Sequence, residues 1–209
     1  MARGEPILVI EGLGRSFGEH DVVGRLDLEV EPGERVALLG ANGSGKSTVL
    51  RCVAGTLAPS RGRALIGGHE AGAREARSLI GVSLSQERSF SLRVSGRENL
   101  LFFARLRGYG RRGSARTVDG LAEELEIEHV LSERADRCST GMILQLAFAR
   151  ALLGDPPLLL LDEPTRSLDT AAVARLWAAL DRRRETAVLI ATHREDDVER
   201  SDSSVALPL

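Results

Sequence analysis

Short apolar runs alternate along the chain with longer segments in which apolar residues recur at three- and four-residue spacings. The apolar runs predict strands at residues 7–11, 26–30, 35–40, 62–67, 80–84, 158–161 and 187–191. The longer spacings predict helices at residues 46–54, 74–79, 95–106, 117–125, 142–153 and 170–182, and a Gly- and Arg-rich loop at 108–113. Strands that alternate with helices predict an α/β fold with a mainly parallel sheet.

Residues that could bind a ligand or take part in catalysis follow four of the predicted strands. The strands end at Gly40, at Gln86, at the pair Asp162-Glu163 and at His193. In open α/β sheets, ligands bind beyond the carboxyl ends of the strands. The pattern therefore predicts one binding or catalytic site built from all four strand ends.

A glycine-rich segment between a predicted strand and a predicted helix carries the sharpest motif. It reads Gly40, Ala41, Asn42, Gly43, Ser44, Gly45, Lys46, Ser47 and Thr48, which fits G-x-x-x-x-G-K-[ST]. Lys46 is the single lysine of the chain, among 28 basic residues. In this motif the loop amides cradle phosphates and the lysine reaches the β- and γ-phosphates. We expect a nucleoside triphosphate site, in preference to a glycine-rich turn with a surface lysine.

Hydrolysis of a triphosphate needs charge neutralisation, a metal ion and a positioned water molecule. Ser47 is the residue expected to place its hydroxyl on Mg²⁺. Asp162, which follows four leucines, is expected to bind Mg²⁺ through water, and Glu163 to polarise the attacking water. The alternative for this acidic pair is a solvent-facing turn. His193 is expected to contact the γ-phosphate, the alternative being a capping or surface histidine.

Composition narrows the class of protein. With 209 residues and 43% apolar content, the chain can bury one full core. A net charge of −2 argues against nucleic acid as a partner, so we interpret the arginine clusters 111–112 and 182–184 as solvated faces. Cys52 and Cys138 form no C-x-x-C motif, and no apolar run approaches the roughly 20 residues of a membrane span. We expect a cytosolic protein.

The order of these motifs resembles the ATP-binding subunit of ABC transporters over essentially the whole chain. The phosphate loop resembles the Walker A motif of that family, and residues 158–163 resemble its Walker B motif with the catalytic glutamate. Further motifs look like the adenine-stacking aromatic, the Q-loop glutamine, the signature motif, the D-loop and the switch histidine, at Phe17, Gln86, residues 139–142, residues 167–169 and His193.

The resemblance implies one domain over residues 1–209, with a P-loop NTPase core, an N-terminal antiparallel β subdomain and a helical subdomain at roughly 88–153. It also implies a head-to-tail dimer, expected to be a homodimer, in which each ATP lies between Walker A of one subunit and the signature of the other. Ser139, Gly141 and Asp169 would then help to bind ATP, and Gln86 would contribute to the metal site and to catalysis. The implied partner is a separate membrane permease, with the chain on its cytoplasmic face.

Three departures from the family pattern bear on activity. Residues 142–145 after the signature are mostly apolar, and the arginine expected near Gln145 is missing. Either these side chains pack against neighbouring helices, which we favour, or the signature is weakened and turnover is slow. Gln86 lies one residue later than usual, so either Gln86 or Ser85 faces the metal. Residues 205–207 would be the first of the strands that normally follow His193.

Residues 87–101 correspond to the segment on which the family docks its permease, and they look most like ABC-2 exporters. Within or beside this segment we expect Phe90 to contact the partner, and Phe102 and Phe103 to belong to the core. Two alternatives to a transporter subunit stay open: a soluble ABC-type ATPase without a permease, and a regulatory module that binds ATP with low turnover.

Overall fold

The computed structural model describes residues 5–84 and 89–207, and its contacts divide the chain into two compact units. The first unit comprises Met1–Ile80, Pro157–Glu163 and Glu185–Leu209. The second comprises Gly81–Pro156 and Pro164–Arg184. Each unit is therefore built from segments that are distant in the sequence.

An antiparallel sheet forms one part of the first unit, with the strand order β2-β1-β4-β5. Its strands are β1 (Leu8–Phe17), β2 (His20–Val30), β4 (Arg61–Ile66) and β5 (His69–Glu70). The first two form a hairpin that pairs Leu8 with Val30 and Phe17 with His20. The predicted strands 7–11 and 26–30 covered only the far ends of this hairpin, because glycines and charged residues interrupt the apolar pattern of the rest. The predicted antiparallel β subdomain is confirmed.

The second sheet has the strand order β6-β7-β8-β3-β9. Its strands are β3 (Arg35–Leu39), β6 (Ile80–Ser83), β7 (Leu158–Asp162), β8 (Ala187–Thr192) and β9 (Ser203–Ala206). Strand β3 runs parallel to both β8 and β9, and β7 runs parallel to β8. Every residue of β7 and β8 is buried, which explains why both read as continuous apolar runs. The predicted parallel α/β sheet is confirmed.

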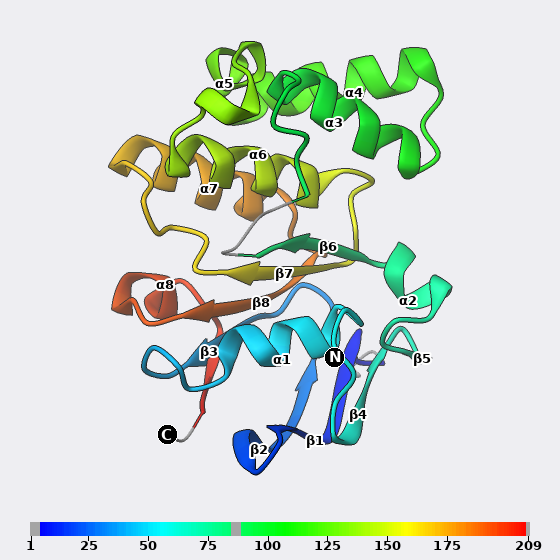
Figure 1. The fold of residues 1–209 in the computed structure, drawn as a ribbon, viewed down its shortest axis with the longest axis vertical. Helices are drawn as coiled ribbons and strands as arrows, with labels where there is room; N and C mark the ends of the chain where they lie inside the picture. The colour runs from blue at the N-terminus through cyan, green and yellow to red at the C-terminus, as the bar shows by residue number, and fades with distance from the viewer. Residues whose placement is uncertain (1–4, 85–88, 208–209) are drawn as a thin grey trace. The chain divides into compact units, whose positions relative to one another are not determined.

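Helix α1 (Lys46–Val53) packs against β7 and β8 (Figure 1). The first unit also contains two short helices, α2 (Arg74–Ser78) and α8 (Glu195–Glu199). The strand that follows α8 is β9, at residues 203–206 rather than 205–207. Two of these short elements, α8 and β5, were missed, because a single turn or bridge shows no hydrophobic period.

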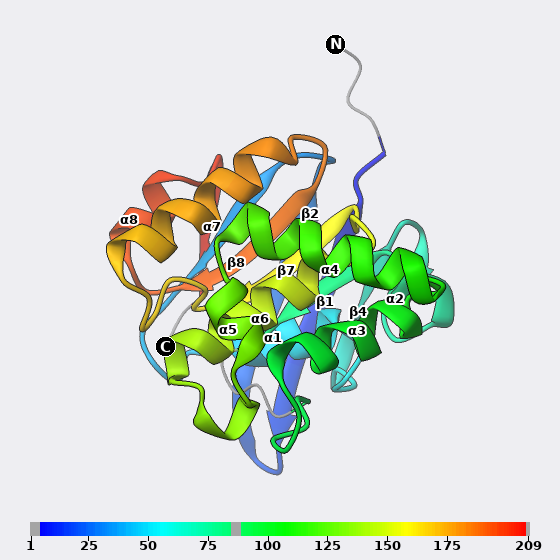
Figure 2. The same cartoon turned by 90° about the horizontal axis from the view of Figure 1, so that it is seen from above.

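Apart from residues 81–83 of β6, the second unit is mainly helical, as Figure 2 shows from above. Its helices are α3 (Gly96–Leu106), α4 (Arg111–Leu125), α5 (Glu128–Ser132), the 3₁₀ helix η1 (Ala135–Arg137), α6 (Thr140–Leu152) and α7 (Thr170–Arg182). Helix α3 packs against α4, α5 and α6, and α4 also packs against α7. The buried Trp177 of α7 is among the largest core side chains.

Helix α4 corrects the predicted loop at residues 108–113, because it begins at Arg111 and not at 117. Arginine is a good helix former, and Arg111 and Arg112 are exposed, so this first turn carries no apolar period. None of the helices within the described ranges 5–84 and 89–207 is long and apolar enough to cross a bilayer.

Candidate functional site

The phosphate loop connects β3 to α1 and depends on glycine at defined positions. Gly43 and Gly45 have φ angles of 90° and 92°, which L side chains rarely adopt. A Cβ on Gly45 would lie 2.6 Å from the carbonyl oxygen of Val22. Gly45 is therefore required twice, for its backbone angle and for its close approach to β2. As the N-cap of α1, it brings the positive end of that helix to the loop.

Lys46 is folded back onto the loop. Its side chain is 6% exposed, and Nζ donates hydrogen bonds to the carbonyl oxygens of Gly40 (2.6 Å) and Ala41 (3.0 Å). Both partners are neutral carbonyl groups beside the loop amides. A cation and free amide groups at a helix N-terminus together form a site for an anion such as phosphate.

The acidic pair lies at the end of β7. Asp162 is 2% exposed and ends the strand, and Glu163 follows it with a φ angle of 51°. The amide of Glu163 donates to Ala191 O at 2.8 Å, which fixes the turn against β8. A non-glycine residue in the left-handed region stores backbone strain, and such strain clusters at functional sites. The alternative of a solvent-facing turn does not describe this buried pair.

Glu163 pairs with the histidine at the end of the neighbouring strand. His193 Nδ1 and Glu163 Oε1 lie 2.8 Å apart. A carboxylate oxygen accepts hydrogen bonds, so the tautomer of His193 that carries a proton on Nδ1 can donate to Glu163. The other Glu163 oxygen, Oε2, is buried without a hydrogen-bond partner among the described residues. The structure thus brings together two residues that the sequence placed thirty positions apart.

The turn after β8 holds His193 in place. The hydroxyl of the buried Thr192 donates to Asp197 Oδ2 at 2.8 Å and accepts from the amide of Arg194 at 3.1 Å. This network was missed in the sequence, because Asp197 belongs to a helix too short to be predicted.

Two oxygen donors in the first unit suit a magnesium ion. Ser47 is the second residue of α1, and Asp162 ends β7, against which α1 packs. A hydroxyl and a carboxylate are hard oxygen ligands, and Mg²⁺ commonly uses one or two protein oxygens together with substrate phosphates. Across the residues that the structure describes, no cluster of three or more His, Cys, Asp or Glu side chains could hold a metal ion. The donor set therefore fits Mg²⁺ that is shared with a phosphate ligand.

Phe17 ends β1 at the tip of the hairpin, where its side chain is 49% exposed. The hairpin contacts the phosphate loop, since Gly45 lies against Val22 and Val23 of β2. The exposed ring therefore belongs to the hairpin that borders the loop. Gln86 and Ser85, the two alternatives for the metal-facing position, lie outside the described residues.

The signature segment lies in the second unit, at the start of α6. Ser139 is the exposed N-cap, and its Oγ accepts from the amide of Met142 at 3.2 Å. A Cβ on Gly141 would lie 2.6 Å from the carbonyl oxygen of Ser167, whose φ angle is 65°. Asp169 caps α7 by accepting from Ala172 N at 2.7 Å. Gly141 is thus needed for close packing of the signature helix on the D-loop, a contact that no sequence signal indicated.

The apolar residues after the signature show mixed burial. Leu144 is 7% exposed, and Ile143 is half-buried. The interpretation that these side chains pack against neighbouring helices therefore holds for Leu144.

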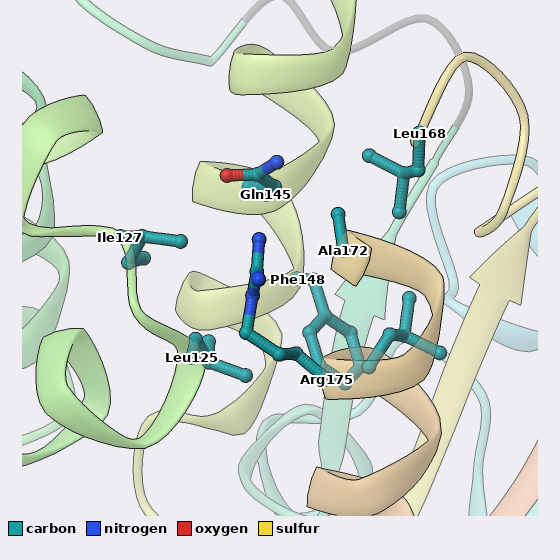
Figure 3. Close-up of a pocket in the computed structure, with 8 residues that line it drawn as sticks. Leu125, Ile127, Gln145, Phe148, Leu168, Ala172 and Arg175 are labelled. Carbon is teal, nitrogen blue, oxygen red and sulfur yellow. The ribbon is translucent and has the colours of Figure 1, made fainter. Parts of the chain in front are cut away.

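Gln145 lines a small pocket between α6 and α7. The pocket has room for about one water molecule and is drawn in Figure 3. Arg175 of α7 also lines it and extends its guanidinium into it, while Arg175 Nη1 donates to Glu126 Oε2 at 3.3 Å. The arginine that the family pattern places near Gln145 is missing from α6, but Arg175 of α7 lines the same pocket.

The aromatic assignments beside α3 require a correction. Phe90 is 7% exposed, with its ring edge-on to Phe103 at a centroid distance of 5.9 Å. The guanidinium carbon of Arg150 lies 5.4 Å from the Phe90 ring centroid and 5.2 Å from that of Phe103. Phe102, by contrast, is 56% exposed. The predictions for Phe90 and Phe102 were wrong, because the polar neighbours of Phe90 hid the packing of its ring under Arg150.

Comparison with known proteins identifies the family. The model of the ABC transporter family matches residues 23–166, and the chain belongs to this family. It is 37% identical over 195 residues to the Nod factor export ATP-binding protein I of a Rhizobium species, covering 91% of this chain and 64% of that protein. The chain thus spans less than two thirds of that relative.

Solved structures show the same fold. An ATP-binding subunit of an ABC transporter is 28% identical, with a TM-score of 0.86 over 96% of this chain and 85% of that one. The subunit cbiO1 of Clostridium perfringens, part of the ABC transporter complex cbiONQ, is 27% identical, with a TM-score of 0.79 over 98% of this chain and 85% of that one.

Proposed function

We propose that this chain is the ATP-binding and ATP-hydrolysing subunit of an ABC transporter and powers a separate membrane permease. The observation that carries the proposal is the 2.8 Å pair between Glu163 and His193, in the same compact unit as the Lys46 loop. A carboxylate held by a histidine, on strand ends next to a phosphate loop, is suited to activate water against a terminal phosphate.

Each residue of the first unit has a defined task in this proposal. The loop amides and Lys46 bind the phosphates, and Lys46 exchanges its two carbonyl partners for phosphate oxygens. Thr48 lies next to Ser47 and can bond a phosphate oxygen. Bound through Ser47 and Asp162, with Gln86 as a further ligand, Mg²⁺ would neutralise phosphate charge.

Glu163 and His193 divide the work at the terminal phosphate. Glu163 orients and polarises the attacking water, with one oxygen held by His193 and the other free among the described residues. His193 Nε2, on the far side of the ring, would contact the γ-phosphate by donating a hydrogen bond, since phosphate oxygens accept. Nδ1 of the same ring contacts Glu163. Loss of the γ-phosphate would therefore change the position of Glu163 through His193 alone.

The site is completed by a second copy of the chain. Ser139 and the amide of Gly141 lie at the N-terminal end of α6, where the helix dipole favours an anion. We propose that they bind the γ-phosphate of a partner subunit in a head-to-tail homodimer, and that Asp169 supports this contact. ATP would then close the dimer and hydrolysis would reopen it.

We propose that the partner is a membrane permease and that transport is outward, and the names of the relatives support both. Two relatives, each 37% identical to this chain, are ATP-binding proteins named for Nod factor export, which supports an exporter of the ABC-2 type. The chain would then lie on the cytoplasmic face of the membrane, bound to the permease. Nucleic acid is not expected as a partner, given the net charge of −2.

Turnover measured with and without the permease tests this function. A six-helix permease encoded beside this chain would be purified with it in lipid nanodiscs, and phosphate release from Mg·ATP followed. We expect hydrolysis that the permease stimulates. Hydrolysis indifferent to the permease would favour the permease-free ATPase, and ATP binding without measurable hydrolysis would favour the regulatory module.

A further inference from the structure

Arg15 and Phe17 form a stacked pair near the end of β1. The guanidinium carbon of Arg15 lies 4.4 Å from the centroid of the Phe17 ring. One face of this ring is therefore covered by a cation, although the side chain of Phe17 is 49% exposed. The exposed area of Phe17 therefore belongs to the part of the side chain that Arg15 does not cover.

Arg15 is half-buried and anchored by a backbone contact. Its Nη1 donates to Ala58 O at 3.0 Å, in the segment that follows α1. Its Nε is buried without a hydrogen-bond partner among the described residues. Burial raises the pKa of the Cys52 thiol in α1, and the nearby charge of Arg15 opposes that rise. The hydrogen bond to Ala58 thus links Arg15 of the hairpin to the segment after α1, which restrains the guanidinium that lies over Phe17.

The same hairpin borders the phosphate loop. Arg15 pairs with Val23 in the register of β1 and β2, and Val23 lies against Gly45 of the loop. A series of contacts therefore links the loop glycine to Val23 and Val23 to Arg15, whose side chain lies over Phe17. The stacked pair and the phosphate loop belong to the same compact unit, so a nucleotide bound at the loop lies in the same unit as the pair.

We infer that Arg15 is a positioning residue for the base of the bound nucleotide. Its guanidinium fixes the plane of the Phe17 ring and closes one face, so the base stacks on the other. A cation on the far face also strengthens the stack, because the ring is polarised between two flat partners. This inference rests on the proposed function, which supplies the nucleotide.

A double-mutant cycle with two ligands tests the inference. Binding of ATP and of inorganic tripolyphosphate, which has no base, would be measured by competition with a fluorescent nucleotide. Arg15→Ala is expected to weaken ATP binding about two- to fivefold and to leave tripolyphosphate binding unchanged. In a Phe17→Ala background the same change is expected to cause no further loss. Arg25→Ala removes an equal charge from the same hairpin and is expected to bind both ligands normally.

Three results would overturn the inference: no loss of ATP affinity in Arg15→Ala, an equal loss for both ligands, or a loss that persists without the Phe17 ring. If Arg15→Ala does not fold, as judged by thermal unfolding, Arg15→Lys takes its place in the cycle, since lysine lacks the planar group. Wild-type protein that binds tripolyphosphate but not ATP would also overturn it while leaving the phosphate loop intact. Wild-type protein that binds neither ligand would refute the proposed function itself.

Discussion

At the scale of single residues, Lys46 and Glu163 each adopt a conformation that a bound ligand would explain. Lys46 directs an ammonium at two neutral carbonyls, and Glu163 occupies a left-handed backbone conformation with one buried oxygen free of hydrogen bonds among the described residues. The backbone angle and the unpartnered oxygen of Glu163 cost free energy, whereas Lys46 holds its ammonium beside the loop. Both are explained if a triphosphate and a water molecule complete the site.

Replacing Lys46 is expected to remove ATP binding. Lys46→Ala deletes the cation that faces the phosphates, and we expect affinity to fall by at least about tenfold, the range for a hydrogen bond to a charged group. Titration with a fluorescent ATP analogue measures the change, and Lys46→Arg is the matched control that keeps charge but lacks the compact ammonium. Undiminished affinity in Lys46→Ala would refute the assignment of the loop.

Replacing Glu163 is expected to separate binding from chemistry. Glu163→Gln keeps the shape of the side chain but removes the base, so ATP should bind while turnover falls roughly 10²- to 10⁴-fold. Without hydrolysis the ATP-bound dimer should persist, which size-exclusion chromatography with Mg·ATP would detect. Wild-type turnover in this variant would exclude Glu163 as the base.

The sequence located the residues of this site better than their contacts. The phosphate loop, the acidic strand end and His193 could be placed because each follows an apolar run that predicts a strand. The contacts of Gly45 with Val22, Gly141 with Ser167 and Arg15 with Phe17 could not, since they depend on backbone approach and ring orientation rather than on spacing.

At the scale of elements, an ion-pair cluster joins α4 to α7. Arg183 donates to both oxygens of Glu124, from Nη1 to Oε1 at 2.5 Å and from Nη2 to Oε2 at 2.8 Å, and Arg182 Nε donates to Oε1 at 3.0 Å. The hydrogen bond from Arg183 holds the pKa of Glu124 below its usual range, although partial burial opposes this. Arginines at 182 and 183 thus do more than coat a solvated face.

This cluster predicts a stability that depends on pH. Because the pKa of Glu124 is depressed in the folded state, its contribution is present above the ordinary glutamate pKa of about 4.5 and is lost as pH falls through the folded value. Glu124→Gln is expected to lower the free energy of unfolding by about 1–3 kcal/mol at pH 7 and by less in acid.

Urea unfolding of wild type and variant from pH 7 down to pH 3 measures this difference. The control is Glu11→Gln, which breaks the exposed pair with Arg63 and should cost under about 1 kcal/mol. A difference for Glu124→Gln that does not change with pH would contradict the role of its charge.

The ends of the helices show how far the pattern of apolar residues can predict an element. Helix α7 was predicted with its observed bounds, since its apolar residues recur over more than three turns. The first turn of α4 was missed, because its arginines face solvent and give no period. The pattern of apolar residues predicts a helix only along the part of it that packs against the core.

At the scale of the whole molecule, three exposed apolar side chains form our proposed contact for the permease of the proposed function. Leu92, Phe102 and Leu106 are 59%, 56% and 67% exposed, and the last two lie four residues apart in α3. Residues four apart share one face of a helix. This face, rather than Phe90, is the contact expected for the partner subunit.

Changing that face is expected to uncouple the permease without affecting ATP binding. The double variant Phe102→Ser and Leu106→Ser should bind ATP with wild-type affinity and lose the stimulation of hydrolysis by the permease. Co-purification and phosphate release in nanodiscs measure the two effects. Full stimulation in the double variant would move the contact elsewhere.

The strand order has a consequence for how the chain folds as it is made. Strand β3 lies between β8 and β9, so Arg35 pairs with Val188, and Val36 also pairs with Ser203. While the ribosome makes the intervening segment, both edges of this apolar strand lack their partners, and an unpaired apolar edge invites aggregation. The helical unit is complete once Arg184 has emerged, whereas the phosphate loop still awaits the sheet that will hold it. We therefore expect nucleotide binding to begin only after β8 and β9 have been made.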